Sequence, residues 1–259
     1  MLQHKGAIAV AEEGGGSNKN KKRQMRVAIV KYNAGNIFSV VHALQRMGVE
    51  PLLTDSPEEL CSADRVIFPG QGEASNAMRY LRQRGLDKVI PSLTQPVLGI
   101  CIGQQLMCRH SEEGDVDCLG IFNAEVKRFV PLRHEDKIPH MGWNSLKFYV
   151  EEQGARGEEQ ENTNYQNDSP APCPLPLAPK GTSLPLSPLF QGLGEEYVYF
   201  VHSFYVPVCE HTSAVTEYIL PFSAAMQKDN FYATQFHPEK SGEVGQRILR
   251  NFLEGSYKW

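Results

Sequence analysis

The chain has 259 residues, of which 41% are hydrophobic and 22% are charged, and its formal net charge is −4. This length and balance are typical of a globular protein with one large or two small domains, and they exclude both a membrane protein and wholesale disorder. Basic residues gather near the amino terminus, so the rest of the chain is acidic, which argues against a nucleic-acid-binding surface.

The sequence carries no sign of a membrane span or a secretion signal. It has no apolar run of about 18 residues, and its amino terminus lacks an apolar segment followed by small residues. Its six cysteines form no C-x-x-C pair and follow no regular spacing. Together these features predict a cytoplasmic protein with reduced thiols, with neither a membrane nor a nucleic acid among its partners.

Residues 1–24 are rich in Gly, Asn, Lys and Glu and have few apolar positions, which predicts a disordered tail followed by one domain over 25–259. From Met25 onward, short apolar runs alternate with segments of helical spacing. This alternation predicts a parallel sheet with helices on both faces. Strands are expected at 26–32, 65–68 and 96–100, and helices at 37–47, from residue 57, and at 101–110.

Two of these helices have recognisable end signals. Gly48 is the expected residue just beyond the first helix. Ser56 is the expected N-cap of the second, with Pro57 in its first turn and Glu59 at the third position.

After about residue 117 the pattern changes to strands, with a final helix at 243–254. The fold class is therefore α/β, with a mixed, mostly parallel central sheet flanked by helices and an added β-rich part. The strands of this second half are expected at 124–129, 145–150, 197–202, 204–208, 224–227 and 231–236.

Residues 151–188 interrupt the β-rich part. The segment begins with acidic residues, ends with prolines and shows almost no periodicity. A loop this long is unusual inside a compact domain, so we interpret it as a disordered insertion. A proline-rich partner-binding segment is the alternative, although plain linkers often have the same composition.

The clearest chemical motif is the G-x-C-x-G formed by Gly99, Cys101 and Gly103 between a buried strand and a helix. A sharp strand-to-helix turn strains its middle residue and leaves no room for flanking side chains. Such a turn would expose the Cys101 sulfur, favour its thiolate and aim the Ile102 N–H at a developing oxyanion. A free cysteine is more often just a small buried residue. We accept that interpretation, or simple exposure, for the other five.

A thiolate needs a partner that moves protons. His237 follows a predicted strand, and Glu239 lies two residues further along an extended His-Pro-Glu segment, where it can hold the imidazole tautomer. The His-Pro-Glu sequence alone is equally typical of a structural histidine beside a turn. Combined with the cysteine turn, it predicts a Cys–His–Glu triad.

A third glycine-rich turn, Pro69-Gly70-Gln71-Gly72, follows another strand at the same sheet edge as Cys101. Glycines on both sides of Gln71 allow its peptide to rotate and to offer an N–H to a bound anion. We expect a second oxyanion donor here, whereas the simpler interpretation is a tight turn.

Three motifs occur in this order: PGQG at 69–72, PVLGICIGQQLM at 96–107 and QFHPEKSG at 235–242. Together they resemble the class I (triad) glutamine amidotransferases, which are cysteine-dependent glutaminases that make ammonia for a second active site. The resemblance covers essentially 25–253 apart from the insertion, and it implies the fold of that family.

Three further segments look like the glutaminase subunit of imidazole glycerol phosphate synthase. They are KYNAGNI at 31–37, IPHMGWN at 138–144 and YFVHSFYV at 199–206. The PHMGWN element discriminates best, because other amidotransferases share the triad but not this segment.

The resemblance implies a role for each matching residue. Cys101 would be the nucleophile, His237 the acid and base, and Glu239 the residue that orients it. The Gln71 and Ile102 backbone N–H groups would form the oxyanion hole. Substrate contacts would come from Gly70, Gly72, Gln105, His202, Ser203 and Phe204, while Asn36, Trp143, Asn144 and Lys240 would lie toward the partner and the ammonia passage.

The same resemblance implies a substrate, L-glutamine, and a partner, a (β/α)8-barrel cyclase that forms a heterodimer with the chain. The cyclase would use the ammonia to make imidazole glycerol phosphate and aminoimidazole carboxamide ribonucleotide in histidine biosynthesis. No metal or redox cofactor is needed for attack by a thiolate on an amide. A flipping oxyanion strand would keep activity low without the partner.

Some positions depart from the family pattern. Gln71 stands where valine is usual, Gln104 where methionine is common, and Phe204 where tyrosine is frequent. Two alternative functions remain: another triad amidotransferase, serving pyridoxal phosphate, anthranilate or nucleotide synthesis, and a catalytically silent regulatory subunit. The PHMGWN and YNAGN segments argue against the first, and the intact triad argues against the second.

Overall fold

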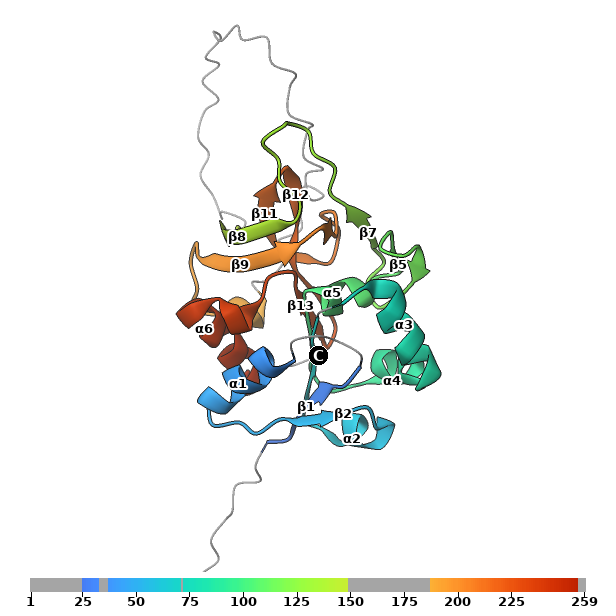
Figure 1. Ribbon diagram of the computed structural model, residues 1–259. Coiled ribbons are helices and arrows are strands. Elements are labelled where there is room, and N and C mark those ends of the chain that lie inside the picture. Colours follow the sequence, from blue (N-terminus) through green and yellow to red (C-terminus); the bar gives the residue numbers. More distant parts are fainter. Residues whose placement is uncertain (1–24, 33–36, 71, 149–186, 256–259) are drawn as a thin grey trace, which may run out of the picture.

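The computed structural model describes residues 25–32, 37–70, 72–148 and 187–255 (Figure 1). The predicted tail lies outside these residues, and so do residues 151–186 of the predicted insertion. Ser187 and Pro188, which we expected at the end of that insertion, belong to the fold. Ser187 is buried and Pro188 begins the 3-10 helix η1 (Pro188–Phe190), because the two apolar residues that follow pack into the core.

A seven-stranded sheet forms the centre of the molecule, in the order β11-β12-β13-β4-β3-β1-β2. The five strands from β2 to β13 are parallel, whereas β12 and β11 are antiparallel additions at one side. This arrangement confirms the predicted α/β class with a mixed, mostly parallel sheet. The strands are β1 (Val27–Val30), β2 (Leu52–Thr54), β3 (Arg65–Phe68), β4 (Val97–Ile100), β11 (Thr212–Tyr218), β12 (Leu220–Lys228) and β13 (Phe231–Thr234).

Helices cover both faces of this sheet (Figure 1). Val27 and Ile29 point into the core beneath α1 (Phe38–Arg46) and α6 (Gly242–Glu254). The alternate residues of the same strand point into the opposite core, as the twofold period of a strand requires. The helices on that second face are α2 (Pro57–Ser62), α3 (Ala74–Gln83), α4 (Leu86–Ser92) and α5 (Ile102–Leu106).

The predicted helix-end signals are confirmed. Ser56 is the N-cap of α2, and its hydroxyl accepts a hydrogen bond from the Glu59 N–H at 3.4 Å. Gly48 follows α1 with a φ of +77°, in the left-handed region that favours glycine. The helix expected at 243–254 is α6 and begins one residue earlier.

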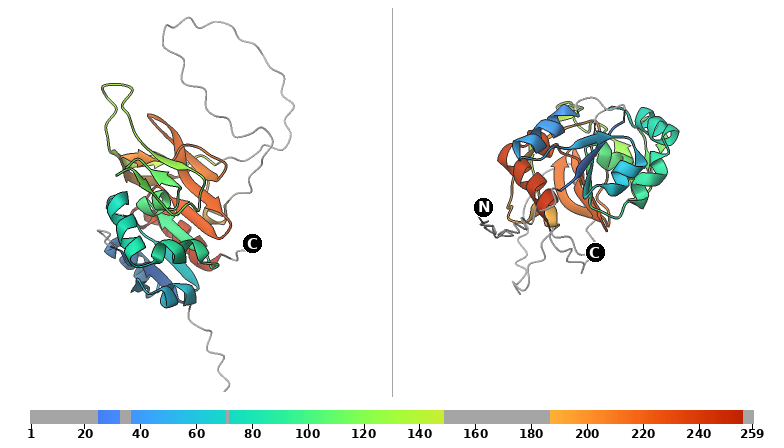
Figure 2. Two further views of the ribbon diagram at one scale, coloured as in Figure 1. Left: turned by 90° about the vertical axis from the view of Figure 1, so that its right-hand side faces the viewer. Right: turned by 90° about the horizontal axis from the view of Figure 1, so that it is seen from below.

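The predicted β-rich part lies at one end of the helix-covered sheet (Figures 1 and 2). It contains a two-stranded antiparallel ribbon and a separate four-stranded sheet in the order β10-β7-β5-β6. The ribbon consists of β8 (His140–Ser145) and β9 (Tyr197–His202). The small sheet consists of β5 (His110–Ser111), β6 (Val116–Asp117), β7 (Glu125–Arg128) and β10 (Phe204–Tyr205).

Two predicted elements are wrong in their placement. The helix expected at 101–110 ends at Leu106, and the chain enters β5 at His110. The strand expected at 145–150 is instead β8, which ends at Ser145 because its register with β9 stops there. Beyond it the chain turns toward β11, where Lys147 bridges Val215.

Other elements were missed, although α3 buries Ala74, Ala77, Met78 and Leu81 at helical spacing. Helices α3 and α4 and strand β11 were not predicted, although β11 completes one side of the central sheet. Among the helices of the described ranges, none combines the length and the apolar character that crossing a bilayer requires.

Candidate active site

The strand-to-helix turn predicted at Cys101 is present. Strand β4 ends at Ile100, Cys101 adopts φ 53° and ψ −108°, and α5 begins at Ile102. A Cβ on Gly103 would lie 2.1 Å from the Phe68 carbonyl oxygen, and one on Gly99 would lie 2.9 Å from the Gly103 carbonyl carbon. Both flanking glycines are therefore required for this backbone, as the motif predicted.

His237 and Glu239 reach this turn from the neighbouring strand β13. The Nδ1 atom of His237 lies 2.8 Å from a Glu239 carboxylate oxygen, and both side chains are almost fully buried. Burial alone would lower the pKa of His237. The neighbouring Cys101 sulfur, to which it hydrogen-bonds, and Glu239 outweigh that effect and raise the pKa of His237 to about 10. An imidazolium between a thiolate and a carboxylate is the resting arrangement of a cysteine triad.

A cavity of about 480 Å³ opens in front of Cys101. The structure brings ten of the predicted site residues to its wall. Glu239 lies behind His237, outside the lining, as an orienting residue should. The ten are Gly70, Gly72, Cys101, Ile102, Gln105, His202, Ser203, Phe204, His237 and Lys240.

The other predicted residues are not gathered at this cavity. Trp143 and Asn144 lie on β8 of the ribbon, and the Trp143 side chain is 57% exposed. Asn36 and Gln71 lie outside the described residues, so the predicted oxyanion donor at Gln71 stays a prediction.

The glycine turn after β3 packs directly against the cysteine turn. A Cβ on Gly70 would lie 2.0 Å from the Ile100 carbonyl oxygen and 2.4 Å from the Ile102 nitrogen. The Tyr32 hydroxyl, at the end of β1, donates a hydrogen bond to the Pro69 carbonyl oxygen just before the turn. Gly72 has a φ of +120°. The turn is thus held close to the backbone N–H that would face an oxyanion.

Gln105 connects the cavity wall to the sulfur through a second glutamine. Its Nε2 donates to the Phe204 carbonyl oxygen at 3.1 Å and to Gln235 Oε1 at 2.9 Å. The Nε2 of Gln235 in turn lies 3.6 Å from Cys101 Sγ. Sequence reasoning missed Gln235, although it stands two residues before His237 on an extended segment.

Glu113 is the charged cavity residue that the sequence did not reveal. Its carboxylate accepts a hydrogen bond from the Ala74 N–H at 2.9 Å, and burial raises its pKa. No motif marks it, because the connection between β5 and β6 brings it to the cavity from outside the central sheet. Pro139 and Val201 also line the cavity without having been predicted.

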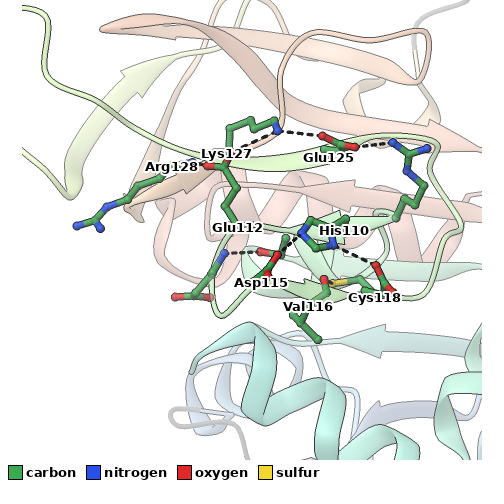
Figure 3. Close-up of polar contacts among 12 residues, drawn as sticks. His110, Glu112, Asp115, Val116, Cys118, Glu125, Lys127 and Arg128 are labelled. Atoms are coloured by element: carbon green, nitrogen blue, oxygen red, sulfur yellow. Dashed lines mark hydrogen bonds and ion pairs between the residues drawn. The ribbon is translucent and has the colours of Figure 1, made fainter.

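Charged contacts hold the segment around Glu113 in place (Figure 3). Lys127 lies 3.3 Å from Glu112 and 2.9 Å from Glu125, while the Arg128 N–H donates to Glu112 at 2.7 Å. Hydrogen bonding to Asp117, outweighing partial burial, raises the pKa of His110, which also contacts Asp115. All of these side chains are partly or largely exposed to solvent, so each pair stabilises the fold only slightly.

The unusual Gln104 points away from the cavity. Its side chain is fully buried and its Nε2 donates to the Ser223 carbonyl oxygen of β12 at 3.0 Å. Its departure from methionine therefore concerns the contact between α5 and β12, not the chemistry at Cys101.

Comparison with known proteins shows the family to which the chain belongs. A model of the family described as glutamine amidotransferase class-I matches residues 28–255. A protein of Bacteroides thetaiotaomicron named imidazole glycerol phosphate synthase subunit HisH is 57% identical over 231 residues, which cover 89% of this chain and all of the relative. A HisH subunit of Idiomarina loihiensis is 41% identical over 231 residues, covering 89% of this chain and 98% of the relative.

Solved structures support the fold. The crystal structure of a putative GMP synthase component from Thermoplasma acidophilum superposes with a TM-score of 0.58 at 19% identity, covering 89% of this chain and 93% of that one. A crystal structure described as a glutamine amidotransferase gives a TM-score of 0.56 at 18% identity, covering 88% and 97%. At such identity the similarity concerns the fold alone.

Proposed function

Because the chain belongs to the class I glutamine amidotransferases and, within them, to the family of HisH subunits, we propose that it is the glutaminase subunit of an imidazole glycerol phosphate synthase. It hydrolyses L-glutamine to glutamate and ammonia and passes the ammonia to a synthase partner. The observation that carries this proposal is the line from Cys101 through His237 to Glu239 at the wall of one cavity.

The reaction begins at the Cys101 sulfur. The thiolate attacks the side-chain amide carbon of glutamine, forming a carbon–sulfur bond and a tetrahedral oxyanion. The carbon–nitrogen bond then breaks, and the His237 imidazolium gives its proton to the departing ammonia. A thioester remains on Cys101. Glu239 holds the Nδ1–H of His237 throughout, so that the other ring nitrogen faces the sulfur.

Hydrolysis of the thioester uses the same residues, with His237 now acting as a base instead of an acid. Neutral His237 takes a proton from water, and the resulting hydroxide attacks the thioester carbon. The carbon–sulfur bond breaks, releasing glutamate and restoring the Cys101 thiolate beside the His237 imidazolium. His237 thus gives one proton to ammonia and takes one from water, while the new carboxyl group loses its remaining proton to solvent. No step changes an oxidation state, so the cycle needs no oxidant or reductant.

The developing oxyanion would lie at the amino-terminal end of α5. The Ile102 N–H at the start of α5 would be one donor, and the Gln71 N–H, which the resemblance to the family implies, would be the second. Gly70 permits this arrangement because its own backbone is in close contact with Ile102.

The rest of the cavity fits the ends of a glutamine molecule. Its lining includes Gln105, Ser203 and Phe204, together with Gly70, Gly72 and His202. Glu113 supplies the carboxylate that would pair with the α-ammonium group of the substrate. We add Glu113 to the proposed substrate-binding residues on this basis.

The partner would dock on the ribbon. Met141 and Trp143 are both more than half exposed on β8, and Lys240 reaches the cavity from η2 (Pro238–Lys240). In the proposal the partner is the (β/α)8-barrel cyclase of histidine biosynthesis. It combines the ammonia with its ribonucleotide substrate to form imidazole glycerol phosphate and aminoimidazole carboxamide ribonucleotide. Asn36, Trp143, Asn144 and Lys240 would lie along the passage between the two subunits.

The deciding experiment measures glutamate release by the purified chain, first alone and then with the cyclase and its ribonucleotide. Strong activation only in the complex is the expected result. Equal and substantial release in both conditions would retain the triad but point to another amidotransferase. A complex that forms on a sizing column and releases no glutamate would favour a silent regulatory role.

A further inference from the structure

Two buried histidines outside the triad belong to the ribbon, at the side where it meets the cavity. His140 of β8 and His202 of β9 are paired across the ribbon, and the Nδ1 atom of His140 lies 3.0 Å from the Nε2 atom of His202. Their exposed fractions are 3% and 6%. Among the described residues neither ring hydrogen-bonds directly to Cys101 or His237, so the proposed chemistry does not use them directly.

The protonation of this pair is fixed from one end. His202 Nδ1 lies 2.7 Å from the Phe204 carbonyl oxygen, which can only accept. His202 Nδ1 therefore carries the hydrogen. In a neutral ring its Nε2 then accepts, so His140 Nδ1 must donate to it.

The contacts of Asn144, on the other side of His140, are consistent with this order of donors and acceptors. The Nδ2 atom of Asn144 lies 3.4 Å from His140 Nε2, and it also donates to the Glu217 carbonyl oxygen at 3.0 Å. Asn144 Oδ1 accepts the Ser145 N–H at 2.8 Å. These two backbone contacts orient the amide so that its donor side faces His140, whose Nε2 is then the acceptor.

The surroundings keep both rings uncharged. His140 stacks on Tyr218 at 4.0 Å and on Phe200 at 4.8 Å between ring centroids. Burial lowers the pKa of His140 to about 4 and that of His202 to about 3. An added proton on either ring would also place two donors against each other.

We propose that Asn144, His140 and His202 form one directional hydrogen-bond chain that positions the Phe204 carbonyl group in the cavity wall. Each bond runs the same way: the Asn144 amide donates to His140, His140 to His202, and His202 to Phe204. All three are positioning residues. The effect of the chain on glutamine rests on the proposed function, whereas the protonation of the rings does not.

The Phe204 carbonyl is where the chain meets the site. It accepts a second hydrogen bond from Gln105, which continues through Gln235 toward Cys101 Sγ. Loss of the His202 bond would free the Phe204 peptide to rotate and would withdraw the acceptor that holds Gln105. We expect weaker glutamine binding, with the sulfur and its imidazolium still in place.

The first test concerns the rings alone. The full chain, with its histidines labelled with ¹⁵N, is studied by NMR between pH 6 and 8. His140 and His202, assigned by their loss in H140F and H202N, should both be neutral with hydrogen on Nδ1. A cationic ring, or hydrogen on Nε2 of either, would overturn the chain.

The second test separates hydrogen bonding from packing. His140→Phe keeps an aromatic ring for Tyr218 and Phe200 but has no donor, whereas His140→Asn places an amide donor near the position of Nδ1. Measured as glutamate release in the complex with the cyclase, H140F should raise KM for glutamine about tenfold with kcat within about twofold. H140N should recover most of that loss. Equal impairment of both variants in KM would contradict the proposal.

A third variant keeps the test valid if H140F does not fold. Asn144→Asp puts an acceptor against His140 Nε2 and should move its hydrogen from Nδ1 to Nε2 in the NMR spectrum, with the same rise in KM. An unchanged tautomer would overturn the proposal. Absence of glutamate release by the unmodified protein in its complex with the cyclase would contradict the proposed function alone. Wrong tautomers in an active complex would contradict the hydrogen-bond chain alone.

Discussion

Cys101 differs from the other described cysteines in its surroundings. Burial raises the pKa of the Cys118 thiol to about 12 and that of Cys108 well above its usual range, which makes both poor nucleophiles at neutral pH. Cys101 instead has an imidazolium and a helix amino terminus beside it. Reactivity therefore depends on position in the fold, not on the number of thiols.

Replacing Cys101 with alanine should abolish glutamate release, by at least about 10³-fold in kcat, because no other group can form the thioester. The measurement is a glutamate assay of the complex with the cyclase. Cys118→Ala is the matched control and should keep normal activity. Unchanged glutamate release by C101A would refute the assignment of the nucleophile.

Glu113→Gln tests the proposed contact with the α-ammonium group of glutamine. The substitution keeps the size and the hydrogen bond to the Ala74 N–H but removes the charge. We expect KM for glutamine to rise about 10- to 100-fold with little change in kcat, since a half-buried charge-assisted contact is lost. Glu112→Gln, which removes the neighbouring carboxylate paired with Lys127, should leave KM within about twofold. Equal effects of both substitutions would contradict the contact.

At the scale of elements, the site depends on two turns in van der Waals contact. Gly70 and Gly103 let the ends of β3 and β4 approach more closely than any side chain would permit. The backbone N–H of Ile102 is thereby placed by backbone contacts, with the Tyr32 hydroxyl holding the glycine turn beside it. Most side-chain substitutions would leave such a backbone donor in place. A Cβ added at Gly70 or Gly103 would displace it.

Gly70→Ala should therefore lower kcat strongly, by about 100-fold, because a Cβ 2.0 Å from the Ile100 carbonyl oxygen forces the two turns apart. Gly194→Ala provides a control, since nothing lies within 4 Å of its Cβ. Thermal melting of both variants distinguishes a displaced turn from an unfolded protein. A fully active G70A would show that the turn does not contribute to the oxyanion site.

Prediction from sequence succeeded where an element carries its own signal. The β1, β3 and β4 strands, the Ser56 cap and α6 follow from apolar runs, capping residues and helical spacing, and the cysteine turn follows from its two glycines. Strand β8 did not, because His140 is buried by stacking on aromatic rings from other strands. Glu113 and Gln235 were missed for the same reason: their roles come from contacts across the fold.

For the whole molecule, His140 and His202 make stability depend on pH. Their pKa values in the folded state lie below the value of about 6.5 expected in the unfolded chain. Between about pH 4 and 6.5 the unfolded chain thus binds more protons than the folded chain, so the free energy of unfolding rises with pH. The stability that the two neutral rings contribute is lost on acidification.

In H140F the free energy of unfolding should depend less steeply on pH over this window than in the unmodified chain. The slope should be smaller by up to about 1.4 kcal/mol per pH unit, because one of the two histidines no longer titrates. Urea denaturation at half-unit pH steps from 4.5 to 7 measures the slope of each protein. Identical slopes would mean that His140 is protonated equally in the folded and unfolded states.

The position of β13 has a consequence for synthesis of the protein. This strand lies between β4 and β12. It pairs in parallel with β4, which ends one residue before Cys101 and more than a hundred residues earlier in the chain. The nucleophile therefore emerges from the ribosome long before His237 and Glu239 do. We therefore expect an incomplete chain that lacks β13 to leave glutamine unhydrolysed, because its cysteine has no base beside it.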